Sequence, residues 1–230
     1  MGKLPVRALS TDIRAELKWN VTHRWNAARA FATYLDESQE LYRDKNVLEL
    51  GAGGALPSIV AAQNGARKVL ITDYPDDDLI KNIDFNVTQN ISCPVIRENV
   101  SVQGYIWGRP IDALVNTLPD THLRFDLIIL SDLIFNHSQH DALLSTCEAA
   151  LTTANNTQDQ DTATPPSVLV FYSHHRPHLA HRDMEFFEQA RGRGWHAEEI
   201  LTRKFTPMFP NDSGEESVRS TVHGWRLTRP

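Results

Sequence analysis

The chain has 230 residues with a formal net charge of −6 at pH 7, and 41% of its residues are hydrophobic while 23% are charged. This balance is that of an ordinary globular protein and excludes a disordered or fibrous chain. A negative net charge argues against broad binding to nucleic-acid phosphates, which requires a basic surface. No stretch reaches the roughly 20 apolar residues of a transmembrane helix, so we expect no membrane partner.

The length suits one α/β domain over residues 1–230. Its two cysteines, Cys93 and Cys147, provide neither a disulfide framework nor zinc-ligand spacing. The chain begins without the apolar core of a signal peptide, and we therefore expect a cytoplasmic protein and a monomer. We also expect a separate N-terminal segment over residues 1–21. The polar stretch 152–166, which two prolines close, is typical of a mobile surface loop.

The first half of the chain predicts strands that alternate with helices. Apolar residues recur at helical spacing after Thr22, and short apolar runs stand directly before glycine or aspartate. The expected elements are a helix from Thr22 to about Leu35, a strand at Asn46–Leu50, a helix at Pro57–Asn64, a strand at Lys68–Thr72, a helix at Leu79–Gln89 and a short third strand at Pro94–Arg97.

The second half continues the alternation and ends in a hairpin pattern. The expected elements are a central strand at Phe125–Leu130, a helix at His140–Leu151, a strand at Ser167–Tyr172, a helix at Asp183–Arg191 and two alternating strands at His196–Phe205 and Val218–Thr228. Alternating strands and helices predict a parallel sheet with helices on both faces, and the terminal hairpin adds antiparallel strands at one edge. The fold class is therefore Rossmann-like α/β.

The strongest functional pattern is the segment 46–58, NVLELGAGGALPS. A buried strand ends at Leu50, and the glycines that follow let the backbone approach a ligand without a Cβ in the way. Asp73 ends the next strand, where a carboxylate can accept hydrogen bonds from both ribose hydroxyls. A dinucleotide-binding enzyme could use the same glycine loop and the same carboxylate. The pattern ELGAGG rather than GxGxxG favours S-adenosylmethionine, which has the ribose but no pyrophosphate.

ELGAG followed by KVLITD resembles the first two motifs of the seven-strand methyltransferases. With RWNAARAFATY, YIWG, SDLIFNH and FYSHHRP, the resemblance narrows to the family 16 lysine methyltransferases and spans about residues 20–228. It is nearest to the fungal members that methylate translation elongation factor one-alpha on its N-terminal glycine and the adjacent lysine. The resemblance thus implies S-adenosylmethionine as cofactor and elongation factor one-alpha as the protein substrate.

The resemblance also implies which residues contact the cofactor. Trp107 follows the third strand, where an indole can cover an adenine face. Ser131 ends the central strand, at the sheet edge where ligands bind in such folds. Trp25 could close the methionine end of the cofactor, although a tryptophan at helical spacing often belongs to the core. The implied set is Trp25, Gly51, Ala52, Gly53, Asp73, Trp107 and Ser131.

For the acceptor amine we expect Asp132, Phe135, Asn136 and Tyr172. Asp132 could stabilise an ammonium or take up its proton, or it could only cap the strand end. Phe135 and Tyr172 could face a methylated ammonium by cation–π attraction, or both could be core aromatics. The family's D-x-x-Y reads here as D-x-x-F, so Phe135 stands where a hydroxyl is usual.

The run Ser173–Pro177, SHHRP, contains adjacent histidines that point to opposite faces of a strand and cannot readily share one ion. We expect no metal there and place the run at the mouth of the substrate site. Two other functions stay open at this point. One is a small-molecule N-methyltransferase acting on a nicotinamide-like amine, and the other is a non-catalytic scaffold that keeps the fold to bind a partner.

Overall fold

The computed structural model of the chain describes residues 25–120, 123–153, 164–208 and 213–229. The predicted N-terminal segment 1–21 and residues 154–163 of the predicted loop 152–166 lie outside the described residues.

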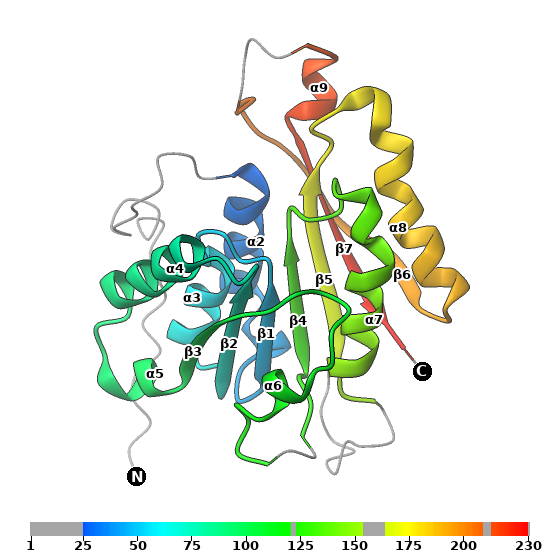
Figure 1. The fold of residues 1–230 in the computed structure, drawn as a ribbon. Helices are drawn as coiled ribbons and strands as arrows, with labels where there is room; N and C mark the ends of the chain where they lie inside the picture. The colour runs from blue at the N-terminus through cyan, green and yellow to red at the C-terminus, as the bar shows by residue number, and fades with distance from the viewer. Residues whose placement is uncertain (1–24, 121–122, 154–163, 209–212, 230) are drawn as a thin grey trace.

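Within the described residues, seven strands form one sheet in the order β3-β2-β1-β4-β5-β7-β6 (Figure 1). Strands β1 to β5 run parallel to one another, whereas β7 runs antiparallel to both β5 and β6. The strands are β1 (Asn46–Leu50), β2 (Lys68–Asp73), β3 (Val100–Gly104), β4 (Leu127–Ser131), β5 (Ser167–Ser173), β6 (His196–Lys204) and β7 (Thr221–Thr228). The Rossmann-like sheet and the antiparallel terminal strands are confirmed.

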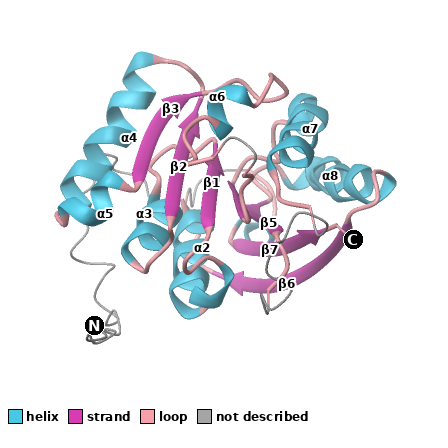
Figure 2. Ribbon diagram, turned by 90° about the horizontal axis from the view of Figure 1, so that it is seen from below, coloured by secondary structure: helices cyan, strands magenta, loops and turns pink. Residues whose placement is uncertain are grey.

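Helices cover both faces of the sheet, with α2 and α3 on one side and α7 and α8 on the other (Figure 2). The helices are α2 (Asn26–Glu37), α3 (Leu56–Gln63), α4 (Asp77–Asn90), α5 (Pro94–Glu98), α6 (Asp112–Val115), α7 (His140–Ala150), α8 (Ala180–Gly192) and α9 (Glu216–Arg219). None of the helices in the described ranges is long and apolar enough to cross a membrane.

The strand side chains alternate between two hydrophobic cores. Val47 on β1 and Phe171 on β5 pack with α2 and α3, while Leu48 and Val170, their neighbours in the chain, pack with α7 and α8. A strand that is buried on both faces reads as a continuous apolar run, as residues 127–130 of β4 do, whereas β1 is equally buried but includes Glu49. Because the sheet is buried on both sides, only its edges and the strand ends can carry a site.

Two stretches differ from the elements that the sequence predicts. Residues 94–97 form part of helix α5, not a third strand, and β3 begins only at Val100. Pro94 suits the first turn of a helix, because its φ is fixed in the helical range and no backbone N–H is needed there. The last strand begins at Thr221 instead of Val218, because residues 216–219 form the short helix α9.

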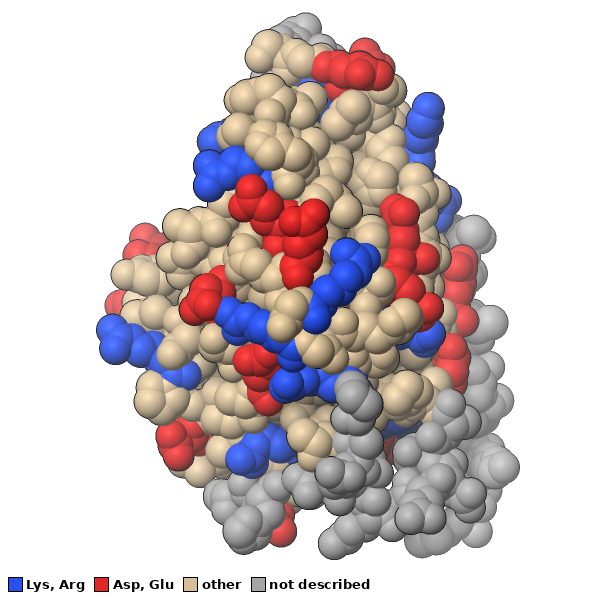
Figure 3. Space-filling view, turned by 90° about the vertical axis from the view of Figure 1, so that its right-hand side faces the viewer, with Lys and Arg blue, Asp and Glu red and all other residues tan. Residues whose placement is uncertain are grey.

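Charges of both signs are interspersed on the side of the molecule shown in Figure 3. Arg193, at the end of α8, forms ion pairs with Asp141 and Glu148 of α7. Glu148 also accepts a hydrogen bond from the indole N–H of Trp195 at 3.3 Å. These contacts join the two helices on the outside of their shared core.

Candidate active site

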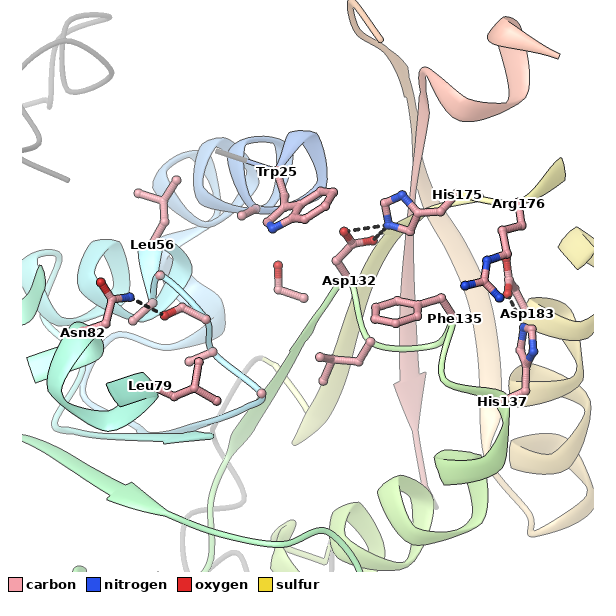
Figure 4. Close-up of a pocket in the computed structure, with 18 of the residues that line it drawn as sticks. Trp25, Leu56, Leu79, Asn82, Asp132, Phe135, His137, His175, Arg176 and Asp183 are labelled. Atoms are coloured by element: carbon pink, nitrogen blue, oxygen red, sulfur yellow. Dashed lines mark hydrogen bonds and ion pairs between the residues drawn. The ribbon is translucent and has the colours of Figure 1, made fainter. Parts of the chain in front are cut away.

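A cavity of about 560 Å³ opens at the carboxyl ends of β1, β4 and β5, a volume typical of sites for small molecules and cofactors. The glycine loop and α4 lie on one side of it, and the segments after β4 and β5 lie on the other (Figure 4). Five predicted cofactor residues line it, namely Trp25, Gly51, Ala52, Gly53 and Ser131. Leu56, Leu79 and Asn82 also line it but were not predicted from the sequence.

The loop after β1 has a backbone that only glycine adopts easily. Gly51 has a φ of +62° and Gly53 a φ of +54°. A Cβ on Gly51 would meet the side chains of Leu133 at 2.6 Å and Trp107 at 2.9 Å, whereas one on Gly53 would meet nothing within 4 Å. The space beside Gly51 is thus filled by neighbouring side chains, whereas the space beside Gly53 is open.

Hydrogen bonds from two neighbouring elements fix the loop in place. The Asp73 carboxylate at the end of β2 accepts from the backbone N–H of Gly53 at 2.7 Å and from that of Tyr74 at 2.7 Å. On α4, Asn82 and Asn86 donate to the carbonyl oxygens of Gly53 and Gly54 at 3.4 and 3.3 Å. Asp73 is not among the residues that line the cavity, but it lies beside the loop with carboxylate lone pairs still available for a ligand.

Trp107 does not line the cavity but packs behind Gly51, between the glycine loop and the core on the α7 side. The edge of its ring lies under Gly51, and the side chain is partly buried against the core on the α7 side. Its position near the loop agrees with the expected region, but its face is not among the lining surfaces of the cavity.

Asp132 and His175 lie next to each other in the lining of the cavity and are joined by a hydrogen bond (Figure 4). Nε2 of His175 lies 2.9 Å from each carboxylate oxygen of Asp132. Desolvation alone would lower the pKa of His175, but the hydrogen bond and the charge of Asp132 outweigh it and raise that pKa. Trp25 and Phe135 flank the imidazole edge-to-face, with ring centroids 5.4 and 5.8 Å away.

A second histidine–carboxylate cluster lies deeper in the same cavity wall. Asp183 on α8 is buried and accepts from His137 Nε2 at 2.7 Å and from His174 Nδ1 at 2.6 Å. His174 and His175 therefore turn to opposite sides, as expected for adjacent strand-end residues. Among the described residues no group of His, Cys, Asp and Glu is arranged to hold a metal ion.

Two of the residues expected around the acceptor amine are not brought to the cavity. Tyr172 is buried, its hydroxyl contacts the sulfur of Met184 at 3.3 Å, and its ring stacks on His223. Burial also raises the pKa of Tyr172 well above its ordinary value. Asn136 follows Phe135 but does not line the cavity, and its side-chain oxygen accepts from the Ser138 hydroxyl. Asp132 and Phe135 remain at the cavity, joined by His137, His175 and Asp183.

Glu49 lies directly behind the glycine loop and is completely buried. One carboxyl oxygen accepts from the backbone N–H of Ser58 at 3.3 Å, and the other has no hydrogen-bond partner. Desolvation raises the pKa of Glu49 to about 8. This carboxyl group is therefore protonated at neutral pH.

The order of strands, the glycine loop after β1 and the cavity at the strand ends define a Rossmann-like methyltransferase. The precorrin-6y C5,15-methyltransferase of Geobacter metallireducens has the same fold, with a TM-score of 0.56 at 15% identity over 98% of each chain.

Residues 12–192 match the family described as lysine methyltransferase, and the chain belongs to this family. It is 48% identical to the protein N-terminal and lysine N-methyltransferase EFM7 of Cryptococcus neoformans, over 90% of this chain and 71% of that protein. It is 43% identical to the protein of the same name from Schizosaccharomyces pombe, over 90% and 76%.

The protein is an S-adenosylmethionine-dependent methyltransferase. The open space at Gly53 and the free lone pairs of Asp73 fit a nucleoside with a cis-diol, and the cavity volume fits a ligand of this size. When bound, the cofactor supplies an activated methyl group on a sulfonium.

Proposed function

We propose that the protein methylates the α-amine of the N-terminal glycine of translation elongation factor one-alpha, and the lysine beside it. The names of the related fungal enzymes, protein N-terminal and lysine N-methyltransferase, support this choice of acceptor atoms. The arrangement of Asp132 and His175 at the mouth of the cofactor cavity carries the proposal. Because translation takes place in the cytoplasm, the proposal also places the enzyme there.

The proposal assigns the cofactor to the cavity formed by Trp25, Gly51, Ala52, Gly53 and Ser131. Asp73 would accept from the ribose hydroxyls, and Trp107 would support the loop from below. This differs from the expectation that Trp107 covers the adenine. We leave Asn136 and Tyr172 out of the proposed set, because Tyr172 is buried against Met184 and Asn136 is bonded to Ser138, with neither in contact with the glycine loop or the cavity.

Methyl transfer needs a neutral amine aligned with the sulfonium. The bound S-adenosylmethionine would supply its methyl group to the lone pair of the amine nitrogen, and S-adenosylhomocysteine would be the second product. Asp132 stabilises the arriving ammonium and takes up the proton that the amine gives away. An α-amine has a pKa of about 8 and a lysine side chain one of about 10.4. The terminal amine is therefore more often neutral near pH 7 and needs less help from a base.

The aromatic rings at the cavity mouth suit the cationic product. Trp25 and Phe135 are 41% and 53% exposed and stand on either side of His175. An aromatic face attracts a methylated ammonium by roughly 0.5–2 kcal/mol. Phe135 supplies this face without a hydroxyl, so Asp132 is the group that orients the amine.

The experiment is methylation of a peptide beginning Gly-Lys, followed by mass spectrometry of the modified residues. We expect labelling of the α-amine, a rate that rises with pH and levels off near about 8, and loss of most activity after α-acetylation. Free nicotinamide is the control and should stay unmodified. Full methylation of the acetylated peptide on its lysine would refute the N-terminal assignment.

A further inference from the structure

Two segments at the carboxyl ends of the strands carry the residues around the proposed acceptor site. They are residues 132–139 between β4 and α7 and residues 174–179 between β5 and α8. Asp132 and Phe135 lie on the first segment, and His175 lies on the second. The first segment is fixed at its start, because Asp132 hydrogen-bonds to the backbone of β5. Beyond that point it leaves the sheet, so another element has to hold its far end.

That element is α8, which acts through the buried carboxylate of Asp183. The side chain of Asp183 is 5% exposed, and its two oxygens accept from His137 Nε2 at 2.7 Å and from His174 Nδ1 at 2.6 Å. His137 lies near the far end of the first segment, and His174 begins the second. Figure 4 shows the bond between Asp183 and His137 at the wall of the cavity. One carboxylate thus ties both segments to the same helix.

The two segments are therefore joined at two points. Asp132 meets His175 at the first point, and Asp183 bonds both segments at the second. Burying a carboxylate is costly unless donors pair with it, and buried ionic clusters add little net stability compared with apolar side chains of similar size. The stability of the fold alone gives little reason for a carboxylate here. A single bond would let the segments pivot, whereas two bonds fix their relative position.

We propose that Asp183 is a positioning residue for methyl transfer, which holds Asp132 in place for the acceptor amine by bonding His137 and His174. Both of its oxygens are bonded to histidines, so Asp183 acts through them and not on the amine. A displacement of about 1 Å can lower a rate by about 100-fold when alignment drives catalysis. This inference rests on the proposed function, because Asp132 meets the amine there. It adds a residue of α8, a helix to which the proposed function assigns no part.

The first test breaks one of the two bonds and compares it with a variant that keeps the bond. His137→Leu removes the donor at similar size, whereas the amide nitrogen of His137→Gln can occupy the position of Nε2. On a Gly-Lys peptide at saturating S-adenosylmethionine, we expect kcat to fall about 10- to 100-fold in His137→Leu and to stay within about threefold in His137→Gln. The affinity for S-adenosylhomocysteine should stay within about threefold in both variants, because the glycine loop is untouched.

The control for this test is His181→Leu, the same change at an exposed position of α8 that does not line the cavity. It should keep the wild-type kcat. His174→Leu and His174→Asn repeat the comparison at the other bond, because the amide nitrogen of asparagine can occupy the position of Nδ1. Melting curves show how much of each variant is folded at the assay temperature.

The outcomes separate the inference from the proposed function. Leucine variants that melt lower but keep the wild-type kcat would show that the cluster serves the fold alone, and would overturn the inference. An equal loss of kcat in His137→Leu and His137→Gln would overturn it as well, because the bond would then not be the cause. A wild-type enzyme that does not methylate the Gly-Lys peptide would overturn the proposed function and the inference with it.

The second test needs no turnover and follows the imidazole of His175 by NMR in protein saturated with S-adenosylhomocysteine. The charged groups that act on this ring are Asp132, Asp183 and Arg176, and Asp132 raises its pKa by a hydrogen bond and by its charge. If the cluster holds Asp132 against the ring, His137→Leu should lower the pKa of His175 toward its ordinary value, and His137→Gln should leave it raised. An unchanged pKa in folded His137→Leu would contradict the positioning of Asp132 by Asp183.

Discussion

Asp132 has a backbone conformation that few residues accept. Its φ is +62°, in the left-handed region that Asp, Asn and Gly tolerate best. Its N–H donates to the Phe171 carbonyl at 2.7 Å, and its carboxylate accepts from the Ser173 N–H at 3.4 Å. The neighbouring strand β5 thus holds the side chain at the cavity mouth. Asparagine is the substitution that removes the charge and keeps this backbone.

Asp132→Asn should lower the turnover of a Gly-Lys peptide by about 10- to 100-fold, because an uncharged amide stabilises the ammonium less and cannot take its proton. The affinity for S-adenosylhomocysteine should stay within about threefold, since the shape of the cavity is kept. Steady-state kinetics and calorimetric titration measure the two quantities. Unchanged turnover would remove Asp132 from the reaction.

Asp73→Ala should weaken S-adenosylhomocysteine binding by about 10- to 100-fold, the loss expected for charge-assisted hydrogen bonds. The variant also loses the bond that holds Gly53 in place. Asp77→Ala is the control, because Asp77 is a highly exposed carboxylate in the first turn of α4 that pairs with Lys81, whereas Asp73 bonds the glycine loop. Calorimetry that shows equal affinity for both variants would refute the ribose assignment.

At the scale of elements, the loop between β1 and α3 offers two glycines with different surroundings. Gly51→Ala brings a methyl group against Leu133 and Trp107, so it should lower the melting temperature by several degrees. Gly53→Ala meets no neighbour and should cost only the strain of a positive φ, about 1–2 kcal/mol. Its methyl group would occupy space of the cofactor, so its main effect should be on affinity.

Melting curves and titrations with S-adenosylhomocysteine separate the two effects. If Gly53→Ala binds the ligand as the wild type does, the open space at this loop does not hold the cofactor.

The elements that the sequence predicts correctly are those with a strong local pattern. Apolar runs that end at glycine or aspartate define β1 and β2, and their order places Gly51 and Asp73 at one sheet edge. Residues 94–97 are too few to show a helical or strand period, and Pro94 at the first helical position is the local feature that suits a helix there.

The site was predicted in part, because only strand ends can be located from the chain order. Ser131 ends β4 and Asp132 follows it, and both lie at the cavity as residues at a strand end should. Tyr172 precedes the last residue of β5 and shares the face of Val170, so strand alternation already directs it into the core. The pairing of His137 with Asp183 joins residues 46 positions apart, and no local pattern reports it.

For the molecule as a whole, the buried Glu49 predicts how stability depends on pH. The ordinary pKa of glutamate is 4.5, and burial raises that of Glu49 to about 8. Between these values the folded state keeps a proton that the unfolded chain has lost. The free energy of unfolding therefore falls as the pH rises through this window, by at most about 1.4 kcal/mol per pH unit.

Glu49→Gln keeps the shape of the neutral side chain and removes its titration. The variant and the wild type should have similar stability near pH 4.5, and the variant should become the more stable of the two as the pH approaches 8. Urea unfolding at several pH values measures this. The effect of the histidines on the free energy of unfolding is the same in both proteins and cancels in the comparison. If the two plots of this free energy against pH run parallel, Glu49 is ionised in the folded protein.

The position of β7 affects how the sheet can form during synthesis. Although β7 follows β6 in the chain, it lies between β5 and β6. A nascent chain that has emerged only through β6 cannot attach that strand, because its partner is still inside the ribosome. Until Thr221–Thr228 emerges, the edge of β5 and the core face beside α8 stay exposed. Such an unpaired hydrophobic edge promotes aggregation, so this methyltransferase should depend on chaperones until β7 has emerged.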